Sequence, residues 1–483
     1  MSVVLGVDLA TASARVVAVD LAGAVLTETA VPLPPVRHSA GGRAEQDADY
    51  AAVVHVAIGA TAHRLGARAD DVVALSITGT SGTVVPCDSN GAPVSAALMY
   101  DDRRAATLAE QLSDVVGHLP QHRLLSAPTS ALARIGWLQQ QAPAPLYLST
   151  PDVVLADLAG HVVAADTSHA LKSGADLATV DWPEDVLAAL GVPTSALPTL
   201  VPPGTVVGEV DATIATALGL PPRVRLVSGM TDGCTAQIAA GAVTPGTSVG
   251  VLGTTLVLKG VTPQLVTGFD GAVYSHRSPS GDYWPGGASN VGAGGLSHWF
   301  ADTDLAAADA AAAARGPSTL LWYPLVAEGE RFPFVAPDAR GFTSGDAVDA
   351  VDRYRAHLEG VALVERLGVE RLAAAGVASH EHHAVGGGSR SETWLRIRAT
   401  ALGRPVRRAA QASSGFGAAV LAASPSYGGL SEATHAMVRD DLTVDPVAAE
   451  VARMDDRYAE LTEALVARGW LTREPTPLAE KTL

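Results

Sequence analysis

The sequence predicts an α/β protein built from two related halves, and three observations carry this prediction. With 483 residues, the chain is longer than one hydrophobic core usually organises, so two domains are expected. Its opening segment follows the order strand, strand, strand, helix, strand. A pair of apolar runs joined by a threonine-containing turn opens the chain, and a similar pair recurs in the second half. Two such hairpins could both direct their turns toward a shared cleft.

The first half begins with a meander of strands, followed by a helix and a further strand. Small residues at Ala10–Ser13 form the turn between the first two apolar runs. Acidic residues stand at the start of the helical pattern, where they complement the helix dipole. The predicted elements are strands at Val3–Asp8, Ala14–Asp20 and Ala24–Val31, a helix from Asp47 to about Gly66, and a strand at Val72–Thr78.

The second half repeats this opening around the turn Gly253-Thr254-Thr255. The repeat puts the domain boundary near Ala240–Gly246, which gives an N-terminal domain at residues 1–240 and a C-terminal domain at residues 241–483. The predicted elements of this half are strands at Thr247–Leu252 and Leu256–Gly260, and helices at Asp304–Arg315, Ala347–Ala375 and about Ala449–Gly469.

The charge composition argues against nucleic acid and anionic membranes as partners. The formal net charge is −17, and the only lysines are Lys172, Lys259 and Lys481. A surface this acidic repels phosphate backbones, and no block of basic residues offsets it locally. Any bound phosphate must therefore be held mainly by backbone N–H groups, hydroxyls and a metal ion.

The sequence favours a cytoplasmic protein. No apolar run approaches the ~20 residues of a membrane helix, and Met1–Asp20 lacks the basic start and the cleavage site of a signal peptide. Two cysteines, Cys87 and Cys234, provide no disulfide framework.

The segment Ser228–Cys234 is the strongest candidate for chemistry. It follows the apolar run Val224–Val227, precedes a helix-like segment, and places Asp232 between two glycines at the strand-to-helix junction. A carboxylate there could accept a proton from a substrate hydroxyl. The alternative is that Asp232 caps the helix N-terminus, and the segment alone does not decide between the two roles.

The amino-terminal turn provides a second candidate. Asp8 stands at a strand end and is followed by the hydroxyls of Thr11 and Ser13. Free N–H groups and hydroxyls of a tight turn can hold phosphate oxygens while a carboxylate holds Mg²⁺ through water. An aspartate beside a turn is, however, more often a turn former.

The segment Gly246–Gly250 matches the glycine-flanked serine of hydrolase nucleophile elbows. That motif requires a strand before the serine and a helix directly after it. A β-rich run follows Ser248 instead, so the sequence argues against a serine hydrolase.

Gly386–Ser391 follows the short apolar pair Ala384-Val385 and leads into an amphipathic helix. Consecutive glycines at a strand-to-helix turn let a flat ring lie against the backbone, so this turn is a candidate nucleotide site, with a flexible turn as the alternative. The two commonest nucleotide folds are excluded, since no Gly-Lys pair occurs and no Rossmann glycine pattern follows the first strand.

The run His380–His383 lacks the spacing of helical zinc motifs. We therefore predict a solvated loop there rather than a metal site.

Together these segments resemble the FGGY family of carbohydrate kinases over nearly the whole chain. Gly6–Arg15 looks like the family's first phosphate segment, Gly229–Gly241 its catalytic stretch, Gly253–Thr255 its second phosphate segment and Gly386–Arg390 its adenosine segment. Ser413–Ala419 resembles the small-residue helix start that follows. The resemblance implies the actin-like ATPase (ribonuclease H-like) fold, with two related domains around a catalytic cleft.

The resemblance also implies roles for individual residues. Asp232 is the expected catalytic base, and Asp8 and Asp232 the expected Mg²⁺ ligands. The residues expected to bind the sugar are Asp8, Thr80, Ser81 and Asp232. The residues expected to bind ATP are Thr11, Ser13, Arg15, Gly253, Thr254, Thr255, Gly387, Gly388 and Ser389.

Five short segments are similar to the D-ribulose kinase subgroup, which is xylulokinase-like. They are Thr80–Val84, where xylulokinases usually carry Met-His-Gly, Leu171–Gly174, Tyr274–His276, Gly286–Asn290 and Gly329–Pro333. The similarity implies transfer of phosphate from MgATP to D-ribulose, at its C5 hydroxyl.

Two departures from the family pattern are Ala10, which replaces a glycine of the first phosphate turn, and Gln411, which stands near a common Glu. The rivals are a xylulokinase or other polyol kinase and a non-catalytic sugar- or nucleotide-binding regulator on the same fold. The sequence does not define the oligomeric state, and a homodimer is compatible with it.

Overall fold

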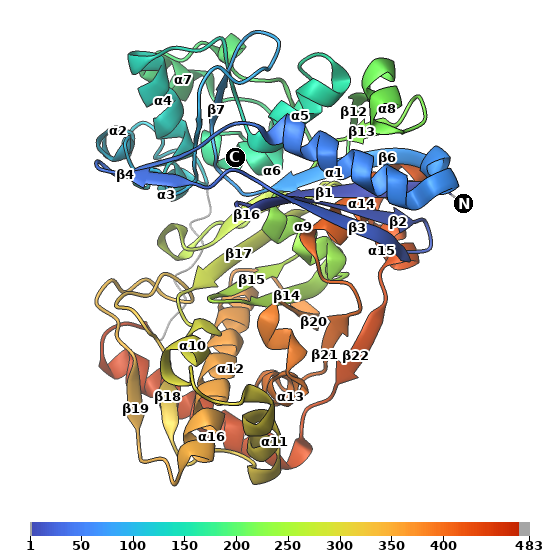
Figure 1. The fold of residues 1–483 in the computed structure, drawn as a ribbon. Helices are drawn as coiled ribbons and strands as arrows, with labels where there is room; N and C mark the ends of the chain where they lie inside the picture. Colours follow the sequence, from blue (N-terminus) through green and yellow to red (C-terminus); the bar gives the residue numbers. More distant parts are fainter. Residues whose placement is uncertain (1, 473–483) are drawn as a thin grey trace. The chain divides into compact units, whose positions relative to one another are not determined.

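The computed structural model describes residues 2–472 of the chain, which divide into two compact units (Figure 1). Among the described residues, the first unit contains residues 2–239 together with two later segments, His276–Gly281 and Ser413–Val438. The second unit contains Ala240–Ser275, Asp282–Ala412 and residues 439–472. The chain thus passes from the first unit to the second between residues 239 and 240, and it later contributes two further segments to the first unit. The expected N-terminal domain at residues 1–240 and C-terminal domain at residues 241–483 stay a prediction.

The first unit is organised around a six-stranded sheet in the order β12-β13-β6-β1-β2-β3. β1 pairs antiparallel with β2 and parallel with β6, and β6 pairs parallel with β13. The three parallel strands therefore end at one edge of the sheet. The strands are β1 (Val3–Leu9), β2 (Ser13–Asp20), β3 (Val25–Pro32), β6 (Val72–Gly79), β12 (Val206–Glu209) and β13 (Arg225–Val227).

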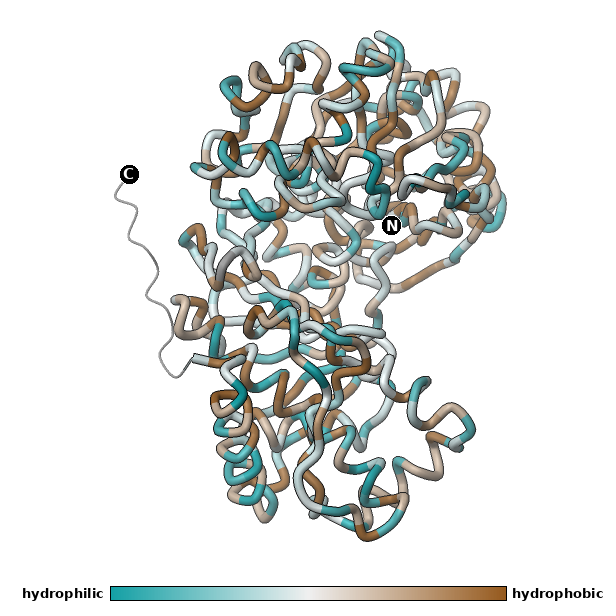
Figure 2. Tube along the Cα trace, turned by 90° about the vertical axis from the view of Figure 1, so that its left-hand side faces the viewer, coloured by the Kyte–Doolittle hydropathy of each residue, from teal (hydrophilic) through white to brown (hydrophobic). Residues whose placement is uncertain are grey.

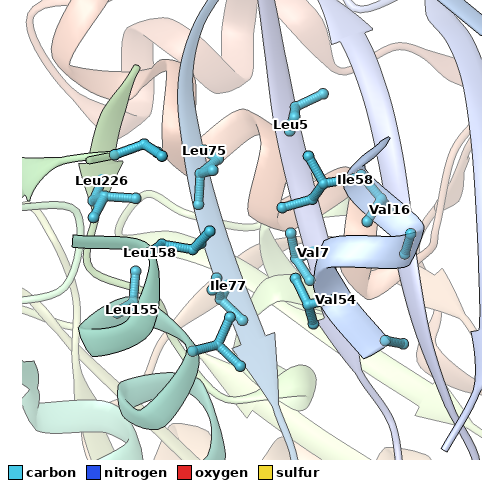
Figure 3. Packing of buried hydrophobic residues seen from close by; sticks show 14 of the residues in the cluster. Leu5, Val7, Val16, Val54, Ile58, Leu75, Ile77, Leu155, Leu158 and Leu226 are labelled. Atoms are coloured by element: carbon cyan, nitrogen blue, oxygen red, sulfur yellow. The ribbon is translucent and has the colours of Figure 1, made fainter. Parts of the chain in front are cut away.

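One face of this sheet packs on α1 (Tyr50–Leu65) and α5 (Thr150–Ala159). Alternate residues of a strand point to opposite faces, so Leu5 and Val7 of β1 share this face. Figure 3 shows them beside Val54 and Ile58 of α1 in a fully buried hydrophobic cluster. The apolar runs of the sequence therefore form the core that supports the strand ends.

The opposite face of β1 is covered by α14 (Ser414–Tyr427), which comes from the later segment Ser413–Val438 and also packs on α9 (Asp232–Ala239). Two glycines make this packing close. A Cβ on Gly6 of β1 would overlap the carbonyl oxygen of Gly415, and a Cβ on Gly417 would overlap that of Thr235. Backbone therefore lies directly against backbone here, which leaves no room for side chains.

The rest of the first unit holds a second hydrophobic cluster, formed largely by residues between Val84 and Leu200. The remaining strands of the first unit are short: β4 (Arg37–Ser39), β5 (Arg43–Gln46), β7 (Val85–Cys87), β8 (Ala97–Leu98), β9 (Leu146–Leu148), β10 (Ala165–Asp166) and β11 (Leu200–Val201). The remaining helices are α2 (Ala106–Gln111), α3 (His122–Leu125), α4 (Ala131–Gln141), α6 (Thr167–Ala170), α7 (Glu184–Leu190), α8 (Ala212–Leu218) and α15 (Leu430–Met437).

The second unit repeats the strand arrangement of the first. Its seven-stranded sheet has the order β16-β17-β15-β14-β20-β21-β22. β14 pairs antiparallel with β15 and parallel with β20, as β1 pairs with β2 and β6. The strands are β14 (Gly246–Leu252), β15 (Leu256–Gly260), β16 (Tyr274–Arg277), β17 (Tyr283–Ser289), β20 (Ser379–Val385), β21 (Val406–Ala409) and β22 (Asp440–Val444). The prediction of two related α/β halves is confirmed.

A two-stranded sheet, five α-helices and two 3-10 helices, Phe269–Gly271 and Gly387–Arg390, complete the second unit's elements described in residues 2–472. The long helix α12 follows β17 and leads to β20, as α1 follows β3 and leads to β6. These elements are β18 (Leu321–Tyr323), β19 (Phe342–Ser344), α10 (Gly294–Trp299), α11 (Leu305–Arg315), α12 (Ala350–Ala374), α13 (Glu392–Leu402) and α16 (Ala448–Ala467).

The predicted strands and helices of both halves are confirmed to within a few residues, but the solvated loop at His380–His383 is wrong. These residues belong to β20, which pairs parallel with both β14 and β21. His382 and His383 are buried, whereas His380 and Glu381 are exposed. The prediction failed because the buried partners of His382 come from distant parts of the sequence.

Hydrophobic stretches are short along the whole described trace and alternate with hydrophilic ones (Figure 2). In agreement with this, none of the helices within residues 2–472 has both the length and the apolar character that crossing a membrane requires.

The close packing of α14 yields a stability prediction. Gly417→Ala should destabilise the protein by about 1–3 kcal/mol or more, because the added methyl group overlaps the backbone of α9 and forces the helices apart. Gly59→Ala is the matched control. Gly59 lies inside α1 with nothing within 4 Å of an added Cβ, so this change should be neutral or stabilise by ~0.5–1 kcal/mol. Equilibrium unfolding in urea measures both, and equal effects would contradict the packing described.

Candidate active site

The parallel strands of the first unit gather the candidate residues at one edge of the sheet. Asp8 lies near the end of β1 and is in register with Thr78 of β6. Thr80 and Ser81 follow the end of β6, and Gly79 forms a parallel bridge with Thr231 just before α9. Carboxyl ends of parallel strands are where ligands bind in open α/β sheets.

Asp8 is half-buried and carries a perturbed carboxyl group. Burial, with a smaller contribution from the negative charge of Asp232, raises the pKa of Asp8 to about 6, and Arg15 opposes this shift. Arg15 lies opposite Asp8 in the β1–β2 ladder and forms an ion pair with Glu28 at 3.2 Å. Asp8 and Asp232 thus interact as two like charges at one site.

Asp232 is exposed and is the first residue of α9. The carbonyl oxygen of Thr231 accepts from the N–H groups of Cys234 and Thr235 at 2.8 and 3.0 Å, so Thr231 precedes the helix. Oδ1 of Asp232 accepts only from the adjacent Gly233 N–H, at 2.6 Å, among the described residues. The capping alternative for Asp232 is therefore not what the structure shows.

The first turn of α14 contacts both carboxylate-bearing segments. The Ser414 hydroxyl donates to the carbonyl oxygen of Asp232 at 3.2 Å, and a Cβ on Gly415 would lie 3.7 Å from the Cβ of Asp8. The small residues at Ser413–Ala419 thus let this helix approach Asp8 and Asp232 together.

The turn between β1 and β2 leaves its candidate groups accessible. Thr11 and Ser13 are half-buried, and Ala10 and Ala12 are exposed. The turn is held through its carbonyl groups, because Gln46 donates to Thr11 O at 2.8 Å and Leu33 N–H donates to Ala12 O at 3.0 Å. Its hydroxyls are not used in this bracing.

Thr80 and Ser81 are half-buried after β6. The Ser81 hydroxyl is buried and has no hydrogen-bond partner, while its carbonyl oxygen accepts from Lys172 Nζ at 3.3 Å. A buried hydroxyl without a partner costs free energy unless a ligand or water satisfies it. Ser81 is therefore available to a polar ligand.

In the second unit the two glycine-bearing turns lie against each other. Gly253–Thr255 joins β14 to β15, and Gly386–Ser389 follows the parallel strand β20. Gly386 has φ 87°, and a Cβ there would lie 2.5 Å from the Leu252 carbonyl oxygen. This left-handed conformation and close approach both require glycine.

These turns differ in what they offer a ligand. Thr254 and Gly387 are exposed, and an added Cβ on Gly387 meets nothing within 4 Å. Gly388 is buried against the Leu252 side chain, and the Ser389 hydroxyl donates to Gly386 O at 2.7 Å. Gly388 and Ser389 thus shape the turn, and Gly387 presents its open surface.

A buried ionic network supports these turns from below. Arg398 donates from Nε and Nη2 to the two carboxylate oxygens of Glu365, each at 2.6 Å, and Glu365 also bonds His382 Nε2 at 3.0 Å. All three side chains are fully buried. Burial alone would raise the pKa of Glu365, but Arg398 and His382 outweigh it and hold this pKa at about 2.

Ser248 Oγ lies 2.9 Å from His382 Nδ1, which gives a Ser-His-Glu arrangement. Ser248 is nevertheless buried in the middle of β14, between its neighbours β15 and β20, and β15 follows instead of a helix. Within the described unit, a substrate cannot reach this serine, so the arrangement is a structural network. The sequence-based argument against a hydrolase is confirmed.

Within residues 2–472 no group of three or more His, Cys, Asp or Glu side chains is arranged to hold a metal ion. Asp8 and Asp232 offer two carboxylates at one sheet edge. This donor set fits Mg²⁺, which is commonly bound through one or two carboxylates together with substrate phosphates and water.

Sequence reasoning gave no role to the buried polar groups behind Asp232. The Asp166 carboxylate bonds the His169 ring at 2.7 Å, and both side chains are almost fully buried. Burial lowers the pKa of His169, but Asp166, with smaller contributions from Asp152 and Asp232, outweighs it and raises this pKa to about 8. The only feature of the sequence that could have pointed to Asp166 and His169 is their position directly before Leu171–Gly174, a segment similar to the D-ribulose kinase subgroup.

Comparison with known proteins identifies both parts of the chain. Residues 3–239 match the N-terminal domain, and residues 242–425 the C-terminal domain, of the FGGY family of carbohydrate kinases. A xylulose kinase of Bacillus subtilis is 23% identical over 94% of each chain, and a ribulokinase of Geobacillus thermodenitrificans is 25% identical over 95% of this chain and 93% of its own. The crystal structure of a xylulose kinase from Rhodospirillum rubrum superimposes with a TM-score of 0.83 at 25% identity, covering 97% of this chain and 99% of its own. The expected actin-like fold is thereby confirmed.

The ionic pair at His169 makes stability depend on pH. The pKa of His169 is raised from 6.5 to about 8 in the folded protein. The stabilisation by the Asp166–His169 pair is therefore full below pH 6.5 and is lost as the pH rises through 8. The loss amounts to about 2 kcal/mol for this shift. His169→Asn should flatten the fall in unfolding free energy between pH 6.5 and 9.

Unfolding curves across this pH range provide the measurement. The exposed His63→Asn serves as the matched control and should leave the wild-type profile unchanged. A His169→Asn profile parallel to that of the wild type would show that the pair is not charged as described.

Proposed function

Since the chain belongs to the FGGY family of carbohydrate kinases, we propose that it phosphorylates D-ribulose with ATP, at the C5 hydroxyl. The observation that carries this proposal is the joint presence of Asp8, Ser81 and Asp232 where β1, β6 and β13 end. A sugar kinase needs a carboxylate near the reacting hydroxyl and polar groups that orient the sugar.

In the proposed mechanism Asp232 accepts the proton of the attacking hydroxyl. Its exposed carboxylate is accessible to a substrate and uses one oxygen in a bond to Gly233 N–H. Proton transfer is late in phosphoryl transfer, so Asp232 acts mainly by orienting the hydroxyl. Asp8 and Ser81 would orient the sugar together with Thr80.

Phosphate oxygens would be bound by the threonine-bearing turns of each unit. In the first unit these groups are the hydroxyls and N–H groups of Thr11 and Ser13, with Arg15 behind them. In the second they are Gly253, Thr254 and Thr255. Gly387, with Gly388 and Ser389 shaping its turn, would form the backbone surface for the adenine ring.

Mg²⁺, held by Asp8 and Asp232, would neutralise charge on the transferred phosphoryl group. The repulsion between these two carboxylates supports this assignment, because a divalent cation relieves it. The acidic composition with its three lysines also favours a metal over side-chain cations.

D-xylulose is the second candidate substrate. Relatives with either kinase name match the chain at closely similar identity, while Ser81 favours D-ribulose. A coupled assay of ADP release with MgATP should compare D-ribulose, D-xylulose, L-ribulose, ribitol, glycerol and a blank without sugar. Preference for D-ribulose supports the proposal, preference for another sugar replaces the substrate, and ATP binding without turnover on any sugar favours a regulator.

Asp232→Asn should lower kcat about 10²–10⁴-fold, because the neutral amide orients the hydroxyl less strongly than a carboxylate and cannot accept its proton, with little effect on the unfolding free energy. Asp185→Asn is the matched control. Asp185 is likewise an exposed acid in the first turn of a helix, α7, and its replacement should leave kcat unchanged. Full activity of Asp232→Asn in steady-state kinetics would remove Asp232 from the mechanism.

Gly387→Leu should raise the KM for ATP at least about tenfold, because the side chain would occupy the open surface assigned to adenine. The fold should tolerate it, since nothing lies within 4 Å of the added Cβ. The KM for the sugar is the internal control and should not change. An unchanged KM for ATP would place the adenine elsewhere.

A further inference from the structure

The backbone on which Asp232 depends is held by buried hydroxyl groups on both sides. From β6, the Thr78 hydroxyl donates to Met230 O at 2.7 Å. From α6, Ser168 Oγ accepts from the Thr231 N–H at 3.2 Å. These two bonds fix the residues directly before Asp232, on which the start of α9 depends.

Ser168 is itself held rigidly. It lies in the four-residue helix α6, whose N-terminus is capped by Asp166 through a 2.8 Å bond from the His169 N–H. The second bond from Asp166 to the His169 ring, at 2.7 Å, fixes the same turn. Ser168 is 0% exposed, so its hydroxyl has no access to bulk water.

His276 completes the contact from a distant part of the chain. Its Nδ1 lies 3.0 Å from Ser168 Oγ, and the ring is 4% exposed. Ser168 Oγ accepts from the Thr231 N–H and has one proton of its own, for which His276 Nδ1 at 3.0 Å is the nearest acceptor, ahead of Thr231 Oγ1 at 3.5 Å and Cys234 Sγ at 3.9 Å. The tautomer with an unprotonated Nδ1 is the one that uses this proton. His276 lies in β16, the edge strand of the seven-stranded sheet, at the point where the chain passes between the units. Residues 276–281 group with the first unit, so this contact lies within that unit.

We propose that Ser168 and His276 are positioning residues that fix the Thr231–Asp232 backbone and so determine where the Asp232 carboxylate meets the sugar hydroxyl. Neither residue is assigned a contact with sugar or ATP, and the proposal rests on the proposed function of Asp232. A chain of two hydrogen bonds transmits the effect, from His276 Nδ1 to Ser168 Oγ and on to Thr231 N–H.

The alternative is a purely structural role, in which the pair stabilises the first unit without affecting turnover. Thr61→Ala is the matched control for this alternative. Thr61 is also 0% exposed, and its hydroxyl donates to Ala57 O at 2.8 Å inside α1. Its loss removes a buried hydroxyl bond on a different element.

The kinetic test compares Ser168→Ala with Thr61→Ala. Ser168→Ala should lower kcat by up to about 10²-fold, the size expected when a catalytic group is misplaced by about 1 Å. Its KM for ATP should stay within about twofold of the wild type. Thr61→Ala should leave kcat unchanged. Equal kcat per folded molecule in wild type and Ser168→Ala would overturn the proposal.

At position 276 the two informative variants are His276→Asn and His276→Leu. Asparagine can place its side-chain oxygen near the position of Nδ1 and accept the Ser168 proton, whereas leucine cannot. Asparagine should therefore retain more of kcat than leucine at equal thermal stability. Equal kcat for both would overturn the role of His276.

Hydrogen exchange separates failure of this proposal from failure of the proposed function. The Thr231 amide should lose protection in Ser168→Ala and keep it in Thr61→Ala, whether or not a substrate has been found. A wild type inactive on every sugar refutes the proposed function, and the exchange result then still decides the positioning role. Unchanged Thr231 protection in Ser168→Ala overturns it.

Discussion

The site depends on the direct packing of the α14 backbone against β1 and α9. Gly6, Gly415 and Gly417 remove the side chains that would separate these elements. As a result, the first turn of one helix contacts the Asp8 strand and the Asp232 segment at once. Interiors packed this closely cannot absorb an extra methyl group without moving their neighbours, so the relative position of the two carboxylates follows from glycine contacts that lie outside the chemistry.

The electrostatics of the chain make the same carboxylates suited to a cation. Burial, and after it the negative charge of Asp232, raise the pKa of Asp8. The 33 lysines and arginines are outnumbered by 50 acidic residues, so the net charge of the chain does not favour binding a polyphosphate through side-chain cations. Backbone N–H groups, threonine hydroxyls and a divalent ion remain as the means of binding it. The acidic composition is therefore compatible with the glycine- and threonine-bearing turns, because these turns would bind phosphate without side-chain cations.

Each unit also buries an ionic network near its candidate site residues. In the first unit Asp166 and His169 fix the helix that carries Ser168. In the second, Glu365 joins Arg398 to His382 beneath β14 and β20. Buried charges are costly unless their partners are fixed and complete, and that same requirement gives the neighbouring backbone a defined position.

The sequence by itself determined the elements, their order and the family, because these depend on local patterns. The apolar runs at Val3–Asp8 and Thr247–Leu252, with their threonine turns, were enough to reveal the duplication. Only the tertiary structure decided that His382 is buried rather than solvated, that Thr231 and not Asp232 precedes α9, and that Ser168 meets His276. It also decided that Ser413–Val438 returns to the first unit. The burial of His382, the contact of Ser168 with His276 and the return of Ser413–Val438 depend on contacts between residues more than a hundred positions apart. The Thr231 N–H bonds Ser168, 63 positions away. Burial and hydrogen-bond satisfaction at such contacts are settled by packing and leave no periodic signal in the sequence.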